Sequence, residues 1–177
     1  MSAPNMITLL RIVLIPAFAT AFLYDQRGLA LALFILAAAT DALDGFLARL
    51  SGQQTRLGSF LDPIADKFLM LTSFVLLGLR GEVPVWALVL VFSREVVIVG
   101  GWMIKHFLTR ISTVNPSGLG KATTFAQIVT IVLFLLDPAL KDVHEVLDLA
   151  LYVAMAFTAL SGLDYLYRGV KELEKRA

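Results

Sequence analysis

Six apolar segments, each long enough to cross the hydrocarbon core of a bilayer, follow one another along this chain of 177 residues. A helix rises about 1.5 Å per residue, so about 20 residues cover about 30 Å of hydrocarbon. Hydrophobic residues make up 58% of the chain and charged residues 16%, against roughly 25% charged in ordinary soluble domains. The pattern predicts an all-α integral membrane protein, a bundle of six transmembrane helices. The predicted spans cover about residues 6–24, 29–49, 58–79, 84–105, 119–136 and 146–167.

The connections between these spans are short, and no repeat, low-complexity run or separable linker interrupts them. We therefore predict a single membrane domain over residues 1–177. The first segment is expected to be a retained span, because no small-residue cleavage site follows a short apolar region there. The absence of cysteine excludes disulfides and cysteine-ligated metals. The net charge of +1 does not bear on nucleic-acid binding, but the chain has no basic stripe with interleaved aromatics, so we predict no nucleic-acid partner.

Lysine and arginine are distributed unequally between the two sides of the predicted bundle. Cytoplasmic loops carry an excess of these residues, so the richer side is expected to be cytoplasmic. The poorer side has only Arg27, Arg80 and Lys141. This distribution places both termini in the cytoplasm. The richer side has Arg49, Arg56, Lys105, Arg110, Lys121, Arg168, Lys171, Lys175 and Arg176.

Four carboxylates lie in one stretch at the cytoplasmic ends of the second and third spans. Asp41 and Asp44 are three residues apart, and Asp62 and Asp66 are four apart. On a helix these spacings place side chains on one face, so a hairpin of two helices could bring both pairs together. Four close carboxylates repel one another unless cations lie among them. Hard oxygen ligands of this kind suit Mg²⁺, Mn²⁺ or Ca²⁺ rather than zinc.

Small residues and one arginine surround the acids. Charges at span ends are tolerated, but ionisable residues within membrane segments are costly and are functional by default. Gly45, Ala48 and Gly58 leave room for a planar or phosphate-bearing ligand, and Arg49 offers a bidentate phosphate partner. The complete pattern is Asp41-x2-Asp44-Gly45-x2-Ala48-Arg49-x8-Gly58-x3-Asp62-x3-Asp66.

This pattern resembles, position for position, the signature of the CDP-alcohol phosphatidyltransferases, and the six spans match that family as well. The opening PNMITLLRIVLIP is similar to the start of its phosphatidylglycerophosphate synthase and cardiolipin synthase branches. The resemblance implies two divalent cations, Mg²⁺ or Mn²⁺, held by the four aspartates and gripping the pyrophosphate of CDP-diacylglycerol. It also implies that Asp66 takes the proton of the attacking hydroxyl, that Arg49 assists at the pyrophosphate, and that Gly45, Ala48 and Gly58 accept the cytidine.

Three further residues lie at spacings of three near the start of the first span: Asn5, Thr8 and Arg11. They are either cap and anchor residues or part of the nucleotide pocket. Because Arg11 is carried into the span, we favour the pocket, with Asn5 and Thr8 as CDP-lipid-binding residues. At the other end of the chain, the basic tail is expected to anchor the protein to anionic lipids.

The acceptor alcohol is less constrained. Arg94, next to Glu95 in the middle of the fourth span, is either half of an ion pair between spans or a ligand of the acceptor phosphate, as a similar Arg-Glu is in the phosphatidylglycerophosphate synthases. Lys121 opens the fifth span and could bind an anion or serve as a positive-inside anchor. Arg110 in the preceding loop could also contribute.

Two departures from the phosphatidylglycerophosphate synthase pattern bear on that choice. That branch has a further arginine where this chain has Trp102, and a second lysine where it has Thr123. Two cations expected to hold glycerol 3-phosphate are therefore absent. An apolar residue at position 102 is closer to the cardiolipin synthase branch, whose acceptor is phosphatidylglycerol. Glycerol 3-phosphate is nevertheless the first hypothesis, and phosphatidylglycerol is the alternative.

A different class of protein, a divalent-cation transporter, could also use intramembrane aspartates. A conduction path needs acids at several depths, whereas these four cluster at one cytoplasmic mouth beside an arginine. We therefore predict an enzyme in a bacterial inner membrane, with its active site facing the cytoplasm. The small residues Gly100, Gly101 and Gly162 are expected to allow close helix packing or a homodimer contact.

Overall fold

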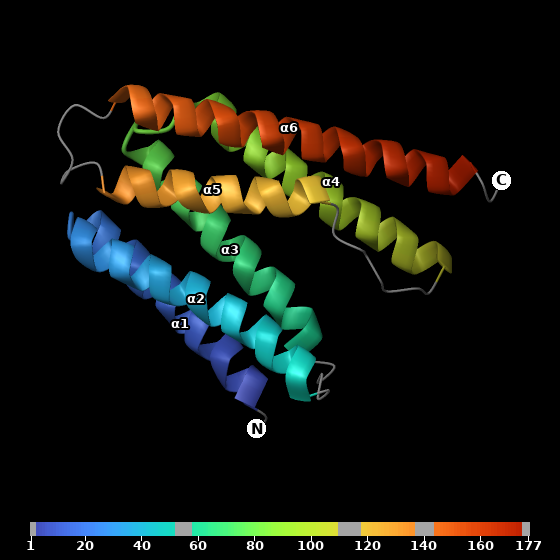
Figure 1. Cartoon of the computed structure of the whole chain (residues 1–177), viewed down its shortest axis with the longest axis horizontal. Helices are drawn as coiled ribbons and strands as arrows, with labels where there is room; N and C mark the ends of the chain where they lie inside the picture. Colours follow the sequence, from blue (N-terminus) through green and yellow to red (C-terminus); the bar gives the residue numbers. More distant parts are fainter. Residues whose placement is uncertain (1–2, 52–57, 110–117, 137–143, 175–177) are drawn as a thin grey trace. The chain divides into compact units, whose positions relative to one another are not determined.

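A computed structural model describes the backbone of residues 3–51, 58–109, 118–136 and 144–174, and side chains within 10–40, 67–101, 118–136, 144–169 and at 171. Every regular element in these ranges is a helix (Figure 1). The all-α prediction is therefore confirmed for the described residues. The helices are α1 (Ala3–Leu23), α2 (Arg27–Ser51), α3 (Gly58–Leu79), α4 (Val85–Thr109), α5 (Gly118–Leu136) and α6 (His144–Glu174).

The six helices correspond one to one with the six predicted apolar segments. The third helix has the predicted bounds, and the largest difference is at α6, which runs to Glu174 instead of about residue 167. Helical hydrogen bonding continues past the apolar stretch because polar residues such as Arg168 and Lys171 are good helix formers. Hydropathy therefore located the helices, but not their polar ends.

Two compact units share the chain. The first contains α1, α2, α3 and the last turn of α5, and the second contains α4, the rest of α5 and α6. In the first unit α1 packs along both α2 and α3. Its buried face carries Leu14, Phe18 and Phe22 at helical spacing. The ring of Phe18 lies 5.8 Å from that of Phe34 on α2, in a tilted arrangement.

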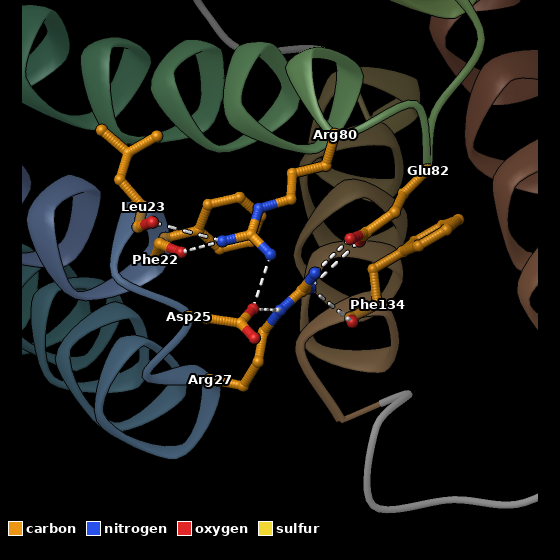
Figure 2. A network of polar contacts seen from close by, with 7 residues as sticks. All are labelled: Phe22, Leu23, Asp25, Arg27, Arg80, Glu82 and Phe134. Carbon is orange, nitrogen blue, oxygen red and sulfur yellow. Dashed lines mark hydrogen bonds and ion pairs between the residues drawn. The ribbon is translucent and has the colours of Figure 1, made fainter.

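Charged residues join the turn between α1 and α2 to the turn that follows α3 (Figure 2). Arg27 donates two hydrogen bonds to the carboxylate of Glu82, and its Nη1 lies 3.4 Å from the carbonyl oxygen of Phe134. Arg80 binds the Asp25 carboxylate at 2.5 Å and the carbonyl oxygen of Phe22 at 2.8 Å. We call Asp25, Arg27, Arg80 and Glu82 the arginine clamp.

The phenyl ring of Phe22 contacts both guanidinium groups of the arginine clamp. The guanidinium carbons of Arg27 and Arg80 lie 4.6 and 5.2 Å from the centroid of this ring, within the range of cation–π attraction. The side chain of Arg27 is only 15% exposed. A cation so far removed from solvent is stable here because carboxylate, carbonyl and aromatic partners replace its water.

In the second unit α4 packs against α6. Within the described part of α4 the buried positions are Ala87, Val91 and Arg94, and those of α6 include Leu151 and Ala154. The rings of Trp86 and Tyr152 stack with their centroids 6.0 Å apart. The buried face of the described part of α4 therefore includes a charged side chain, Arg94.

A row of buried polar side chains connects α5 to α6. Thr123 and Thr130 on α5 reach the carbonyl oxygens of Phe157 and Ala150 on α6, at 2.9 and 3.1 Å. Between them, Gln127 donates to the hydroxyl of Thr158 at 3.0 Å. In lipid, contact between apolar side chains alone gives little driving force for two helices to associate, so interhelical hydrogen bonds of this kind help to join them. We call this row the polar seam.

The outer faces of the helices are apolar. Large hydrophobic side chains such as Val13, Leu79, Val85, Phe125 and Leu149 are more than 60% exposed. Two helices, Gly118–Leu136 and His144–Gly169, are long and apolar enough to cross a membrane within the described residues. Shorter apolar helices cover Leu10–Leu23, Arg27–Thr40 and Lys67–Leu79.

Candidate functional site

The four aspartates predicted to bind metal lie on two helices of the first unit. Asp41 and Asp44 are in the second half of α2, and Asp62 and Asp66 are in the first half of α3. Their side chains lie outside the described residues, as do those of Gly45, Ala48, Arg49 and Gly58. Among the described side chains, no group of three or more His, Cys, Asp or Glu could hold a metal ion. The metal site stays a prediction from the sequence.

Helix α1 contains the residues that we predicted to line the nucleotide pocket. Asn5 and Thr8 lie in its first turns, and their side chains too are outside the described residues. Arg11, one turn further on, is fully buried at 0% exposure. It lies on the same face as Leu14 and Phe18, the face that packs within the first unit. A buried guanidinium is thus present on the helix next to α2 and α3.

Arg94 and Glu95 form an ion pair between neighbours on α4, with side chains 9% and 12% exposed. We considered a pair between spans, but here both residues belong to one helix. The Nε atom of Arg94 is buried and has no hydrogen-bond partner among the described atoms. A guanidinium has five N–H donors, and one carboxylate does not use all of them. Arg94 therefore has the capacity to bind a further anion.

Gly162 on α6 makes room for this arginine. A Cβ atom at position 162 would lie 3.9 Å from the Cγ atom of Arg94, so the aliphatic part of the arginine lies directly over the glycine. The predicted role of Gly162 in close packing agrees with this arrangement within the second unit. A Cβ at Gly100 or Gly101 would meet nothing within 4 Å among the described atoms.

Lys121 and Arg110 complete the acceptor prediction. Lys121 is exposed and lies in the first turn of α5, where unsatisfied N–H groups and the helix dipole favour an anion. Arg110 lies outside the described residues. The side chain of Trp102, which stands where the phosphatidylglycerophosphate synthases have an arginine, is not described either.

The arginine clamp and the polar seam were both missed by sequence reasoning. The sequence assigns Arg27 and Arg80 to short loops, and the acids Asp25 and Glu82 in the same two connections are the signal of possible pairing. Thr123, Gln127 and Thr130 follow one another at spacings of four and three, which is the signature of one helix face. This periodicity is the sequence signal of the polar seam.

Comparison with known proteins assigns the chain to a family. The model of the CDP-alcohol phosphatidyltransferase family matches residues 1–161. The chain belongs to this family. The resemblance inferred from the aspartate pattern is therefore confirmed, and the chain is a phosphatidyltransferase enzyme.

Relatives within the CDP-alcohol phosphatidyltransferase family are similar over most of the chain. A probable phosphatidylglycerophosphate synthase of Mycobacterium tuberculosis is 35% identical, over 96% of this chain and 82% of its own length. A CDP-diacylglycerol–glycerol-3-phosphate 3-phosphatidyltransferase of Bacillus subtilis is 34% identical, over 97% and 96%. A protein of that same name from Sodalis glossinidius is 36% identical, over 98% and 97%.

Proposed function

We propose that this protein transfers the phosphatidyl group of CDP-diacylglycerol to glycerol 3-phosphate and releases CMP, as a step in phospholipid biosynthesis. The observation that carries the proposal is that relatives named for this reaction are 34–36% identical over nearly the whole chain. A phosphatidylglycerol acceptor, favoured by Trp102 and Thr123, is the alternative. A divalent-cation transporter is not favoured by any observation, since the family is one of enzymes.

Two divalent cations, Mg²⁺ or Mn²⁺, are proposed cofactors. The donor set fits them, because four carboxylates supply hard oxygen ligands and the chain contains no cysteine that would favour softer metals. Asp41, Asp44, Asp62 and Asp66 would hold the ions, two residues from each of α2 and α3. When bound, such ions neutralise charge that develops on the leaving phosphate.

The residues around the acids would bind and orient the nucleotide lipid. Arg49 would pair with the pyrophosphate, and Gly45, Ala48 and Gly58 would leave space for cytidine, with Asn5 and Thr8 contributing from α1. Asp66 would accept the proton of the acceptor hydroxyl. The hydroxyl oxygen then bonds to the phosphorus of the phosphatidyl group as the bond from that phosphorus to the CMP oxygen breaks.

The acceptor phosphate is proposed to bind at Arg94, assisted by Lys121 and Arg110. Support comes from the burial of Arg94 and from its Nε atom, which has no hydrogen-bond partner among the described residues. Glu95 holds the guanidinium in place without using all of its donors. Glycerol 3-phosphate carries a phosphate monoester, which suits a charge-assisted bond to arginine.

The enzyme is proposed to be an integral membrane protein with six spans, cytoplasmic termini and an active site facing the cytoplasm of a bacterial inner membrane. Support comes from the two helices able to cross a membrane, from the exposed apolar faces and from the lysine and arginine distribution. A family match over residues 1–161 supports a single functional domain. Among the described atoms none would lie within 4 Å of a Cβ at Gly100 or Gly101, which would suit a homodimer contact.

The reaction is tested with detergent-purified protein and CDP-diacylglycerol. CMP release and the lipid product are measured with glycerol 3-phosphate or with phosphatidylglycerol, in the presence of Mg²⁺, Mn²⁺ or a chelator. We expect metal-dependent CMP release and a phosphatidylglycerophosphate product only with glycerol 3-phosphate. Cardiolipin formed from phosphatidylglycerol would establish the alternative acceptor, and no CMP release with any acceptor would contradict the proposal.

The role of Asp66 is tested by Asp66→Asn. The amide cannot accept the hydroxyl proton, so turnover should fall by about two to four orders of magnitude. Binding of CDP-diacylglycerol should be partly retained. Loss of binding to the same extent as turnover would contradict a role as base.

A further inference from the structure

The arginine clamp joins the beginning of α2 to the end of α3. Arg27 is the first residue of α2, Arg80 follows the last residue of α3, and Glu82 is two residues further on. Both arginines approach Asp25 and the Phe22 ring, and Arg27 is bonded to Glu82. Figure 2 shows these side chains converging from the two turns. These contacts tie the first residue of α2 to the turn that follows α3.

Along α2 and α3, the two aspartate pairs lie at similar numbers of residues from the arginine clamp. Asp41 lies fourteen residues after Arg27, and Asp66 lies fourteen residues before Arg80. Each is therefore about 21 Å along its helix from the clamp. Asp44 and Asp62 lie seventeen and eighteen residues away, or about 26 and 27 Å.

We propose that the arginine clamp is a positioning device for the aspartate site. By fixing the axial register of α2 against α3, it would bring Asp41 level with Asp66 and Asp44 level with Asp62. A shift of one residue would move one pair by about 1.5 Å relative to the other. This inference rests on the proposed function, because it assigns the clamp to the metal-binding carboxylates named there.

A polar clamp has a physical advantage over apolar packing for this task. Apolar side chains on two helices can interlock in more than one axial position with similar burial, whereas paired charges that are mostly removed from solvent specify one partner. The side chains of Arg27 and Glu82 are 15% and 22% exposed, so a slipped register would leave both charges poorly solvated. The clamp residues touch no substrate in this proposal and act only through the helices.

The first experiment measures the metal dependence of CMP release. We compare the wild type with Arg27→Gln, Glu82→Gln and the reversal Arg27→Glu with Glu82→Arg. Arg168→Gln, which removes the ion pair to Asp164 on α6, is the control. The two single variants should raise the half-saturating Mg²⁺ concentration by about tenfold, since ångström-scale misplacement of reacting groups has large effects. The reversal should restore only part of the wild-type value, because it regains the ion pair but places a carboxylate beside Asp25 and the Phe134 carbonyl oxygen, and the control should keep the wild-type value.

The second experiment measures the helix register without activity. The chain has no cysteine, so spin labels can be placed uniquely at Ser51→Cys on α2 and Val75→Cys on α3. Pulsed electron paramagnetic resonance should give a shifted or broader distance distribution in the Glu82→Gln background. The Arg168→Gln background should give the wild-type distribution.

The two experiments separate failure of the inference from failure of the proposed function. A wild-type enzyme that releases CMP without divalent ions contradicts the proposed metal site, whatever the clamp variants do. Unchanged half-saturating Mg²⁺ and unchanged distances in the folded single variants overturn the positioning role. Lower thermal stability with both measurements unchanged would leave the clamp a purely structural feature and also overturn the proposal.

Discussion

At the scale of single residues, Arg94 is the described side chain with the clearest capacity to bind a ligand. An arginine in an apolar helix interface is costly to bury unless it is paired with an acid. The carboxylate of Glu95 is one such partner. The remaining donors, including a buried Nε, are a reason to expect a second anion. Gly162 keeps the arginine close to α6 by leaving space for its aliphatic stem.

Replacement of this arginine tests whether its donor geometry matters. Arg94→Lys keeps the charge but loses the planar fork that binds phosphate through two parallel bonds. The KM for glycerol 3-phosphate should rise by about tenfold, while the KM for CDP-diacylglycerol should change little. Steady-state kinetics in detergent micelles measure both constants, and Arg168→Lys serves as control. An equal rise in both constants would contradict acceptor binding at Arg94.

At the scale of helices, the polar seam decides how α5 and α6 meet. Thr123, Gln127 and Thr130 form one stripe on α5, and their partners on α6 are two carbonyl oxygens and the Thr158 hydroxyl. In a lipid environment, apolar side chains gain little by leaving lipid for a neighbouring helix, so hydrogen bonds and close packing determine the pairing.

Two adjacent threonines allow a matched test of the polar seam. The hydroxyl of Thr123 reaches the Phe157 carbonyl on α6, whereas the described bond of the Thr124 hydroxyl is to Gly120 on its own helix. Thr123→Val should lower the free energy of unfolding by about 1 kcal/mol, and Thr124→Val should change it little. Unfolding in mixed micelles with increasing denaturing detergent measures the difference. Equal effects of the two variants would contradict an interhelical contribution.

At the scale of the whole molecule, the distribution of charge and apolar surface determines the environment. The helices expose large apolar side chains, which is unfavourable in water but suits lipid. The arginine clamp lies in turns that the charge distribution assigns to the side opposite the aspartates. The clamp and the proposed catalytic residues are therefore expected at opposite membrane faces.

This orientation is tested by labelling single cysteines with a membrane-impermeant maleimide. Gln26→Cys lies in the exposed turn between α1 and α2, and Gly169→Cys lies near the exposed end of α6. In intact spheroplasts Gln26→Cys should react, and Gly169→Cys should react only after permeabilisation. The reverse labelling pattern would contradict cytoplasmic termini.

Much of the fold and the family were predictable from the sequence. Long apolar segments predicted all six helices, because backbone polar groups in an apolar setting must be satisfied within the helix. The spacing of Asp41, Asp44, Asp62 and Asp66, with its small neighbours, indicated the family that the comparison confirmed. The metal site itself stays a prediction, since these side chains lie outside the described residues.

Only the tertiary structure decided which polar residues meet. Glu82 lies 55 residues from Arg27 along the chain, and Thr158 lies 31 from Gln127, so no local pattern joins them. Hydropathy and periodicity report the environment of a residue along its own helix, and this suffices to locate helices and faces. Partners on different helices depend on axial register and rotation, which are set by the packing of entire side-chain faces. For this reason the partners in the arginine clamp and the polar seam could be identified only in the tertiary structure.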